Sequence, residues 1–390
     1  MKEHKLYRLS FISLSSIFWC YLLLRAIYSP LVFDEATSYF LFIKNGSFLP
    51  GSAFWSANNH LLNSALAWVS AQLFGPQEWA LRLPNLLAFP VFAFFGFRLM
   101  RSLQSRFLRW WTLGLFFGVH AALEFFSYAR GYGLLLAFML GALWYLNLLY
   151  QQFKPGLFLW FVAFSFLALA SNISALPLFG LLILASFYKV WQSAISQGQK
   201  IGLSILGSLP LAYSLWWSFM LRKHQQLYYG GEEGFLSDSL NSLKTMLLGS
   251  ELSLDLFLAA GALFFIALVA SKPWQSSQWN LAHGLALAFL LITAFYPLGN
   301  LLLGLKFPFD RALLYWLVFG LISFIALLDW HYQKGFKSLI FFSLWSLAFP
   351  LHLFGHLSLN RASFPAWSQE QVPTSFYHFL EKQNAENEDE

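Results

Sequence analysis

Long apolar segments separated by short polar loops constrain the fold of this chain more than any other feature. A helix that crosses a hydrocarbon core of roughly 30 Å needs about 20 mainly apolar residues. Only 11% of the 390 residues are charged and 58% are hydrophobic, more apolar surface than a soluble protein of this length can cover. We therefore expect an all-α polytopic membrane protein with about 11 transmembrane helices. They are predicted at residues 9–28, 82–101, 107–126, 131–150, 157–172, 174–191, 201–220, 251–271, 280–299, 311–328 and 338–356.

One further apolar segment, Leu61–Phe74, is too short to be a twelfth span. As a helix it would reach only about 21 Å, and it carries Asn63 and Gln72. We expect this segment to be a juxtamembrane helix at the outer face of the membrane.

Basic residues are distributed unevenly between the two sides that this order of spans implies. The segments assigned to one side carry the arginine-rich run Arg98–Arg109, and their only acidic residues are Glu3 and Asp329. The positive-inside rule places that side in the cytoplasm. The first span follows a basic start and is longer than a signal-peptide core, so we expect a retained anchor. The N-terminus is then cytoplasmic and the C-terminus extracytoplasmic, in a cell (inner) membrane.

The domain organisation follows from this topology. We expect one transmembrane domain at residues 1–356, which includes the outer loop 29–81, and a short extracytoplasmic tail at 357–390. The tail ends in acidic residues and is expected to be disordered there. The outer loop 221–250 is polar and rich in glycine, which favours a mobile lid.

Two adjacent carboxylates, Asp34 and Glu35, follow directly after the first span. One interpretation is structural: Asp34 caps a helix and Glu35 occupies its first turn, where negative charge is favourable. The other is catalytic: a partly buried carboxylate, with its pKa raised by burial, takes a proton from an acceptor hydroxyl or amine. The two interpretations are compatible.

Further polar residues gather at the expected outer ends of other spans. The candidate substrate-binding residues among them are Asn58, Asn59, His60, Glu124, Tyr128, Arg130, Tyr132, Lys306 and Arg311. An arginine at the bilayer centre costs about 2.5–3.5 kcal/mol, so Arg130 is expected where the chain turns at the outer face, and its guanidinium suits a phosphate. His60 alone is more often a structural histidine, and Arg311 serves equally well as a snorkelling anchor.

These features follow one another in a definite order. The first span is followed by Asp34-Glu35, an amphipathic segment, Asn58-Asn59-His60, a short apolar helix ending in Phe74-Gly75, and Leu81-Arg82-Leu83-Pro84 at the second span. This order resembles the GT-C superfamily of membrane glycosyltransferases. It is most similar to the group of protein O-mannosyltransferases and the lipid A aminoarabinose transferase (glycosyltransferase family 39-like). The resemblance covers the first 150 residues well and the remainder by span count and charge placement.

The resemblance implies transfer of a sugar from a polyprenyl-phosphate-linked donor, such as undecaprenyl phosphate, to an acceptor glycan, lipid or protein. Asp34, with Glu35 as second choice, would be the general base, and the anomeric centre would be inverted. Arg130 and Arg311 would hold the lipid phosphate. Relatives carry an acidic residue two positions before that first arginine, where this chain has Tyr128. Glu124 either replaces that acid or is a structural partner of Arg130.

Other site residues take supporting roles in this interpretation. Asn58, Asn59 and His60 would form hydrogen bonds with the sugar or the acceptor. In the family, an Arg-x-Tyr motif lines the pocket for the lipid phosphate, and in this chain that motif ends at Tyr132.

Several functional classes are disfavoured by motifs that the sequence lacks. There is no His-Glu-x-x-His, Asp-x-Asp or calcium loop, and Cys20 is the only cysteine, so we expect no metal or other cofactor. A divalent cation held by Asp34, Glu35 and Glu124 is the open alternative. Dispersed basic residues disfavour nucleic acid as a partner, and membrane lipids are expected instead. The rival functions are a lipid-linked oligosaccharide transporter (flippase) and a non-enzymatic envelope assembly protein.

Overall fold

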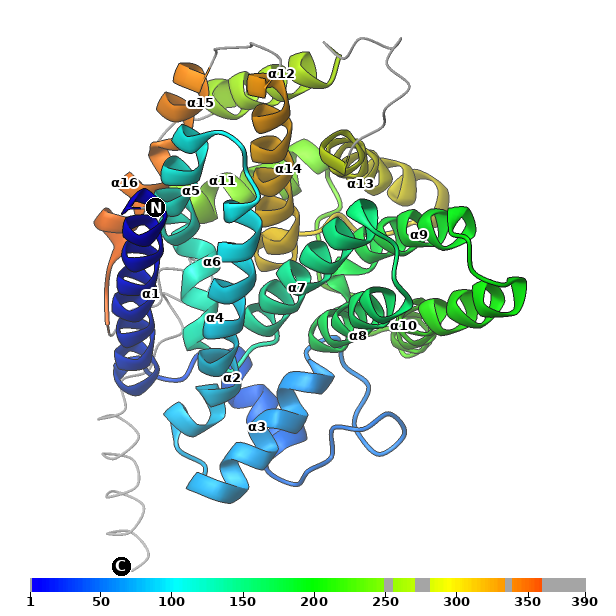
Figure 1. Cartoon of the computed structure of the whole chain (residues 1–390). Coiled ribbons are helices and arrows are strands. Elements are labelled where there is room, and N and C mark those ends of the chain that lie inside the picture. The colour runs from blue at the N-terminus through cyan, green and yellow to red at the C-terminus, as the bar shows by residue number, and fades with distance from the viewer. Residues whose placement is uncertain (1, 249–254, 271–280, 334–338, 360–390) are drawn as a thin grey trace, which may run out of the picture.

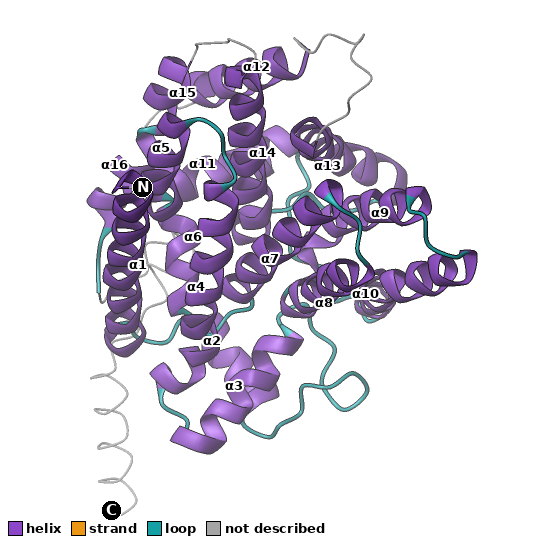
Figure 2. Cartoon of the chain, viewed as in Figure 1, coloured by secondary structure: helices purple, strands orange, loops and turns teal. Residues whose placement is uncertain are grey.

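The computed structural model describes residues 2–248, 255–270, 281–333 and 339–359. Within these ranges the chain is built from α-helices joined by short turns, and no strand is present (Figures 1 and 2). The helices are α1 (Lys2–Tyr28), α2 (Phe33–Ser38), α3 (Leu61–Phe74), α4 (Glu78–Arg101), α5 (Arg106–Gly118), α6 (His120–Glu124), α7 (Tyr132–Gln151), α8 (Pro155–Ser171), α9 (Leu176–Gln192), α10 (Gln197–Lys223), α11 (Asn241–Leu248), α12 (Asp255–Ala270), α13 (Leu281–Leu303), α14 (Leu314–Gln333), α15 (Leu339–Ser346) and α16 (Ala348–His356). Short 3-10 helices span Phe125–Ser127, Ile173–Ala175 and Asp310–Leu313. The segments Tyr39–Ile43 and Phe235–Leu240 are π-helical.

The predicted all-α, multi-pass architecture is confirmed for this part of the chain. Seven helical segments within it are long and apolar enough to cross a membrane: Glu3–Tyr28, Glu78–Arg101, Tyr132–Gln151, Ile173–Gln192, Gln197–Lys223, Leu281–Leu303 and Asp310–Gln333. Each coincides with a predicted span. Helices satisfy their own backbone hydrogen bonds, which a segment in lipid requires.

The remaining four predicted spans are shorter or broken, so the number eleven stays a prediction. Segment 107–126 is interrupted at Val119, whose ψ of 83° ends α5 before α6 begins. Segment 338–356 is divided between α15 and α16. Helix α8 has 17 residues, and 16 residues of the predicted span 251–271 form α12. The short helix predicted at Leu61–Phe74 is α3, with the same bounds.

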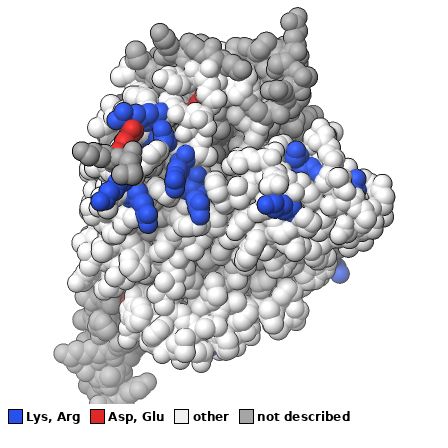
Figure 3. Space-filling model, in the orientation of Figure 1, with Lys and Arg blue, Asp and Glu red and all other residues white. Residues whose placement is uncertain are grey.

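Charged and apolar side chains are separated over the surface in the way a membrane protein requires. Large apolar side chains are exposed along the outer helices, such as Ile205 of α10 at 62% and Leu301 of α13 at 78%. Soluble monomers do not expose apolar surface on this scale. Lys and Arg side chains gather mostly over the upper part of the face in Figure 3, whereas α2 and α3 lie at the lower end in Figure 1.

Helix α7 lies at the centre of the bundle and packs against α4 on one side and α8 on the other. Its first turn makes an unusually close approach to the end of α8. A Cβ atom on Gly131, directly before α7, would lie 2.0 Å from the Ser171 carbonyl oxygen and 2.9 Å from the His60 Cβ. Only glycine permits this contact, which brings the loop before α3, the start of α7 and the end of α8 together.

The glycine-rich loop predicted to be a mobile lid is tied to the segment before α14 over the residues that the structure describes. Gly231 and Phe307 exchange two backbone hydrogen bonds of 2.9 Å. Gly230 has a φ of 148°, and a Cβ there would lie 2.7 Å from the Lys306 Cβ. Ser239 adds a hydrogen bond of 2.5 Å from its hydroxyl to the Pro308 carbonyl. This loop, here called the wall loop, is therefore hydrogen-bonded to the segment before α14, although side chains such as Tyr228 (64% exposed) remain on the surface.

Substituting Gly131 by alanine tests the close approach of α7 to α8. The added methyl group has no space, so we expect Gly131→Ala to destabilise the protein by about 1–3 kcal/mol. Gly180→Ala in α9 is the matched control, because a Cβ there meets nothing within 4 Å and alanine favours the helix. Thermal unfolding in detergent measures both. Equal melting temperatures for the two variants would contradict this packing.

Candidate active site

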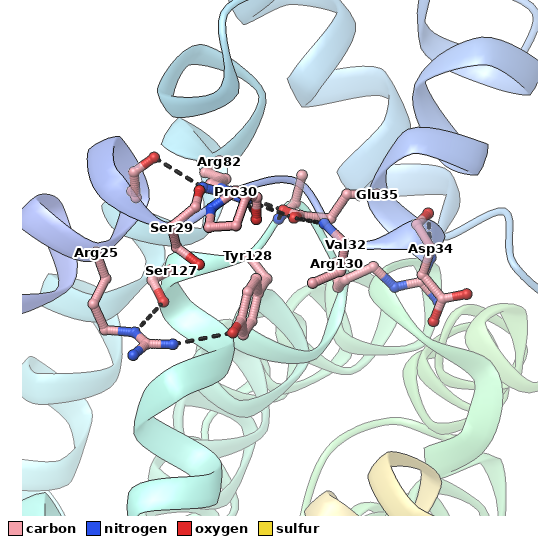
Figure 4. A network of polar contacts seen from close by, with 12 residues as sticks. Arg25, Ser29, Pro30, Val32, Asp34, Glu35, Arg82, Ser127, Tyr128 and Arg130 are labelled. Atoms are coloured by element: carbon pink, nitrogen blue, oxygen red, sulfur yellow. Dashed lines mark hydrogen bonds and ion pairs between the residues drawn. The ribbon is translucent and has the colours of Figure 1, made fainter. Parts of the chain in front are cut away.

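Glu35 lies in the first turn of α2 and is fully buried. Its carboxylate forms a bidentate pair with Arg82 of α4, in which Nε lies 2.9 Å from Oε1 and Nη2 lies 2.7 Å from Oε2 (Figure 4). The backbone N–H groups of Val32 and Ala129 donate to the same two oxygens, at 3.1 and 2.6 Å. Glu35, rather than Asp34, therefore supplies the side-chain cap of α2. A carboxylate with this many donors has a structural role.

Arg82 is also fully buried, and its remaining N–H groups hold the chain where it leaves α1. It donates to the carbonyl oxygens of Ala26 at 3.0 Å, Ser29 at 2.6 Å and Pro30 at 3.0 Å. We did not select Arg82 from the sequence. The sequence does place this arginine between two leucines at the start of an apolar segment. An arginine is favourably buried at such a position only when a buried group of opposite charge pairs with it.

A second buried ion pair lies next to the first. Arg25, near the end of α1, pairs with Glu124, and its Nη2 donates to the Tyr128 hydroxyl at 3.0 Å. That hydroxyl in turn donates to Glu124 at 2.8 Å. The Tyr128 ring lies between two guanidiniums, 5.8 Å from those of both Arg25 and Arg82. The ion pair of Glu124 is therefore with Arg25 and not with Arg130, the partner considered from the sequence, and Arg25 was not foreseen.

Asp34, one residue before Glu35, faces a different environment. Its carboxylate Oδ2 lies 2.8 Å from Nη2 of Arg311 and 3.7 Å from Nη2 of Arg130. Arg130 also donates to the Ser38 hydroxyl at 3.0 Å and to the Asp34 carbonyl oxygen at 3.3 Å. The Asp34 side chain keeps 14% of its surface exposed, whereas that of Glu35 has none. The structure thus brings Asp34, Arg130 and Arg311 to one point, from three segments distant in sequence.

Arg311 is held from the other side by the wall loop. Its guanidinium lies over the Tyr229 ring at 4.8 Å, and the Tyr229 hydroxyl donates to Asp310 at 3.2 Å. Burial raises the pKa of Tyr229, which keeps the hydroxyl protonated as a donor. Lys306, in the segment before α14, pairs with Glu232 of the wall loop at 2.7 Å. This contact joins the two segments.

The Asn58-Asn59-His60 segment divides into different roles. Asn58 Nδ2 lies 3.5 Å from both the Asp34 carbonyl and the Ser38 hydroxyl, at the centre of the site. Asn59 instead donates to the Phe48 carbonyl at 3.0 Å and accepts from Ser64, which fixes the loop.

His60 is buried, and its ring contacts that of Tyr132 at 5.2 Å. Burial, together with the charges of Arg130 and Arg311, holds its pKa well below the ordinary value. His60 is therefore neutral at physiological pH.

The predicted site residues therefore fall into two groups. Asp34, Asn58, His60, Arg130, Tyr132 and Arg311 surround one point, whereas Glu35, Asn59, Glu124, Tyr128 and Lys306 make the structural contacts described above. The three carboxylates considered as cation ligands do not converge, because Glu35 and Glu124 are each engaged by their own arginine. No cluster of three or more His, Cys, Asp or Glu side chains that could hold a metal occurs in the described residues.

A scan against protein-family models, a search of curated proteins and a search of solved structures found no match to this chain. The geometry of the site therefore carries the functional argument.

Replacing Arg82 by methionine tests the structural role of the buried pair. The change leaves the Glu35 carboxylate buried without its countercharge, and we expect a loss of about 3–5 kcal/mol of stability. The double variant Arg82→Met/Glu35→Met should recover part of this loss, since both charges are removed. Thermal unfolding in detergent is the measurement, with the exposed Arg222→Met as control. A single Arg82→Met variant as stable as the control would show that the pair does not hold the fold.

Proposed function

We propose that this chain is an integral membrane glycosyltransferase that transfers a sugar from a polyprenyl-phosphate donor to an acceptor on the extracytoplasmic face. The observation that carries the proposal is the position of Asp34 between Arg130 and Arg311, at the end of the bundle away from the basic cluster. A carboxylate that accepts a proton and two guanidiniums that bind a phosphate are the groups such a transfer requires.

The two arginines suit the phosphate of the donor. Their side chains are only 2% and 11% exposed, so their charges act in a region of reduced water content. Arg130 Nε is buried and has no hydrogen-bond partner among the described residues, which leaves one N–H to donate to a ligand. Guanidinium groups bind phosphate oxygens through paired N–H donors, a geometry that a lysine ammonium does not offer.

Asp34 would act as the general base. The acceptor X–H attacks the anomeric carbon, the bond from this carbon to the phosphate oxygen breaks, and the X–H proton passes to Asp34. The polyprenyl phosphate leaves with its oxygen carrying the released electron pair. One such displacement inverts the anomeric centre. Negative charge grows on the phosphate during the step, so Arg130 and Arg311 stabilise the transition state more than the bound donor.

In the ligand-free protein the Asp34 carboxylate is paired with two arginines, so its availability as a base depends on whether a donor is bound. Both arginines engage the Asp34 carboxylate when no ligand is bound. A donor phosphate competes for the same guanidiniums and releases the carboxylate toward the acceptor. Glu35 does not fit this role, because both of its oxygens accept hydrogen bonds from buried donors.

The orientation in the membrane is part of the proposal. The arginines at the end of α4 and the start of α5 form a basic cluster, which the positive-inside rule assigns to the cytoplasm. The site at α2 then faces the extracytoplasmic side of a cell (inner) membrane, where sugars linked to polyprenyl phosphate are the accessible donors.

Binding and turnover of site variants test this function together. Native mass spectrometry with undecaprenyl phosphate measures binding, and release of this lipid from its sugar-bearing form in the presence of an envelope extract measures turnover. We expect Arg130→Ala and Arg311→Ala to weaken binding about ten- to hundredfold, the worth of one charge-assisted contact. Asp34→Asn should bind the lipid at least as tightly as the wild type, because it no longer competes for the arginines, yet lose turnover about a hundredfold or more.

Arg222→Ala is the matched control, an exposed arginine of α10 with one long contact of 3.5 Å to the Leu303 carbonyl. It should change neither readout. Full turnover in Asp34→Asn would remove the general base, and binding indifferent to Arg130 and Arg311 would remove the phosphate site.

A further inference from the structure

Beside the site lies a small cavity lined by two residues that each carry one buried polar atom with no partner among the described residues. The cavity has a volume of about 10 Å³ and lies between the loop before α3, the end of α8 and the middle of α10. His60 and Asn172 line it, together with the aromatic side chains of Tyr213 and Trp217. This volume accommodates about one water-sized group.

The hydrogen-bonding state of His60 follows from its fixed contact. Its Nδ1 lies 3.1 Å from the Ser171 carbonyl oxygen, which only accepts, so Nδ1 carries the hydrogen. Because burial and the neighbouring arginines keep the ring neutral, Nε2 bears a lone pair and is an acceptor. Nε2 is buried and has no partner in the part of the chain that the structure describes.

Asn172 presents the complementary group. Its Oδ1 accepts a hydrogen bond of 2.9 Å from the Ser174 backbone N–H, which fixes the orientation of the amide. Nδ2 is therefore a donor, and it too is buried without a partner among the described residues. His60 and Asn172 are 6% and 7% exposed, so leaving both atoms unpaired is costly.

A hydroxyl group has the two functions that these atoms require, since it can donate to the acceptor of His60 and accept from the donor of Asn172. A carbonyl oxygen only accepts and an ammonium only donates, so neither fits both atoms. His60 packs against Gly131, the residue that follows Arg130, so the cavity lies close to the expected phosphate position. The group bonded to that phosphate in the donor is the sugar.

We propose that His60 and Asn172 together bind one hydroxyl group of the donor sugar and thereby set the sugar specificity of the enzyme. This inference rests on the proposed function and deepens it, because it assigns sugar recognition to the His60–Asn172 pair. Asn172 is not part of any motif selected from the sequence. A site built around a hydroxyl discriminates strongly against an analogue that lacks it, since the buried partners are then left unpaired.

The test compares the affinities of sugar-bearing and bare lipids for the full-length chain in nanodiscs. The probes are undecaprenyl phosphate, its glucosyl, galactosyl and mannosyl derivatives, and deoxy analogues of whichever sugar binds most tightly. We expect the wild type to bind one sugar-bearing lipid more tightly than the bare lipid, and to lose about tenfold in affinity when one particular hydroxyl is replaced by hydrogen.

In His60→Phe and Asn172→Asp, the preference for the sugar and the effect of that deoxy analogue should both fall about tenfold. In Asn172→Asp, whose residue lies outside the group around Asp34, affinity for bare undecaprenyl phosphate should stay within about twofold. Asn172→Asp retains the oxygen that accepts from the Ser174 N–H but replaces the donor by an acceptor. Asn147→Leu is the matched control, because Asn147 Nδ2 is also buried and has no partner among the described residues, whereas the residue lines a separate apolar cavity bounded by α4, α5, α7, α13 and α14.

The possible failures are distinguishable. If the wild type binds no lipid, the proposed function fails and this inference with it. If the lipids bind through Arg130 and Arg311 but sugar preference is unchanged in both variants, the phosphate site stands and the His60–Asn172 inference is overturned. The same conclusion follows if no deoxy analogue alters wild-type affinity, in which case the cavity holds water only.

Discussion

The buried ion pair between Glu35 and Arg82 is the interaction on which the rest of the site depends. Arg82 binds three carbonyl oxygens of the segment that leaves α1, and Glu35 caps α2 and binds the Ala129 N–H. One pair thus joins α1, α2, α4 and the segment before α7. Removing either partner would leave a buried charge, which is far more costly than losing the whole pair. This cost explains how a polar turn is held at the end of an apolar bundle.

Because this turn is fixed, the adjacent carboxylates of Asp34 and Glu35 face different surroundings. Successive side chains of a helix point about 100° apart, so burying Glu35 against Arg82 directs Asp34 toward Arg130 and Arg311. Arg25, Glu124 and Tyr128 form a second rigid layer behind this turn. Asp34, Arg130 and Arg311, the proposed general base and phosphate-binding groups, are therefore held by structure that is already formed before a substrate binds. Such preorganisation is the main means by which enzymes stabilise developing charge.

The sequence was sufficient for the helices and for part of the site. Hydropathy predicted α3 and the seven long spans because the length of an apolar segment is a local property. The gathering of Asp34, Arg130 and Arg311 at one end of the bundle was predicted from their positions at the expected outer ends of spans, whereas the ion pairs of Asp34 with both arginines were not. The partners of Arg25, Arg82 and Glu124 were not predictable, since they depend on how helices rotate and pack. The break at Val119 was also missed, although Gly118 directly precedes it and ends α5.

The most direct test of this account is an electron cryo-microscopy map of the protein in nanodiscs with undecaprenyl phosphate. We predict phosphate density within hydrogen-bond distance of Arg130 and Arg311, with the Asp34 carboxylate displaced from Arg311 and the Glu35–Arg82 pair unchanged. Phosphate density elsewhere, or a map in which Glu35 rather than Asp34 faces the phosphate, would contradict the account.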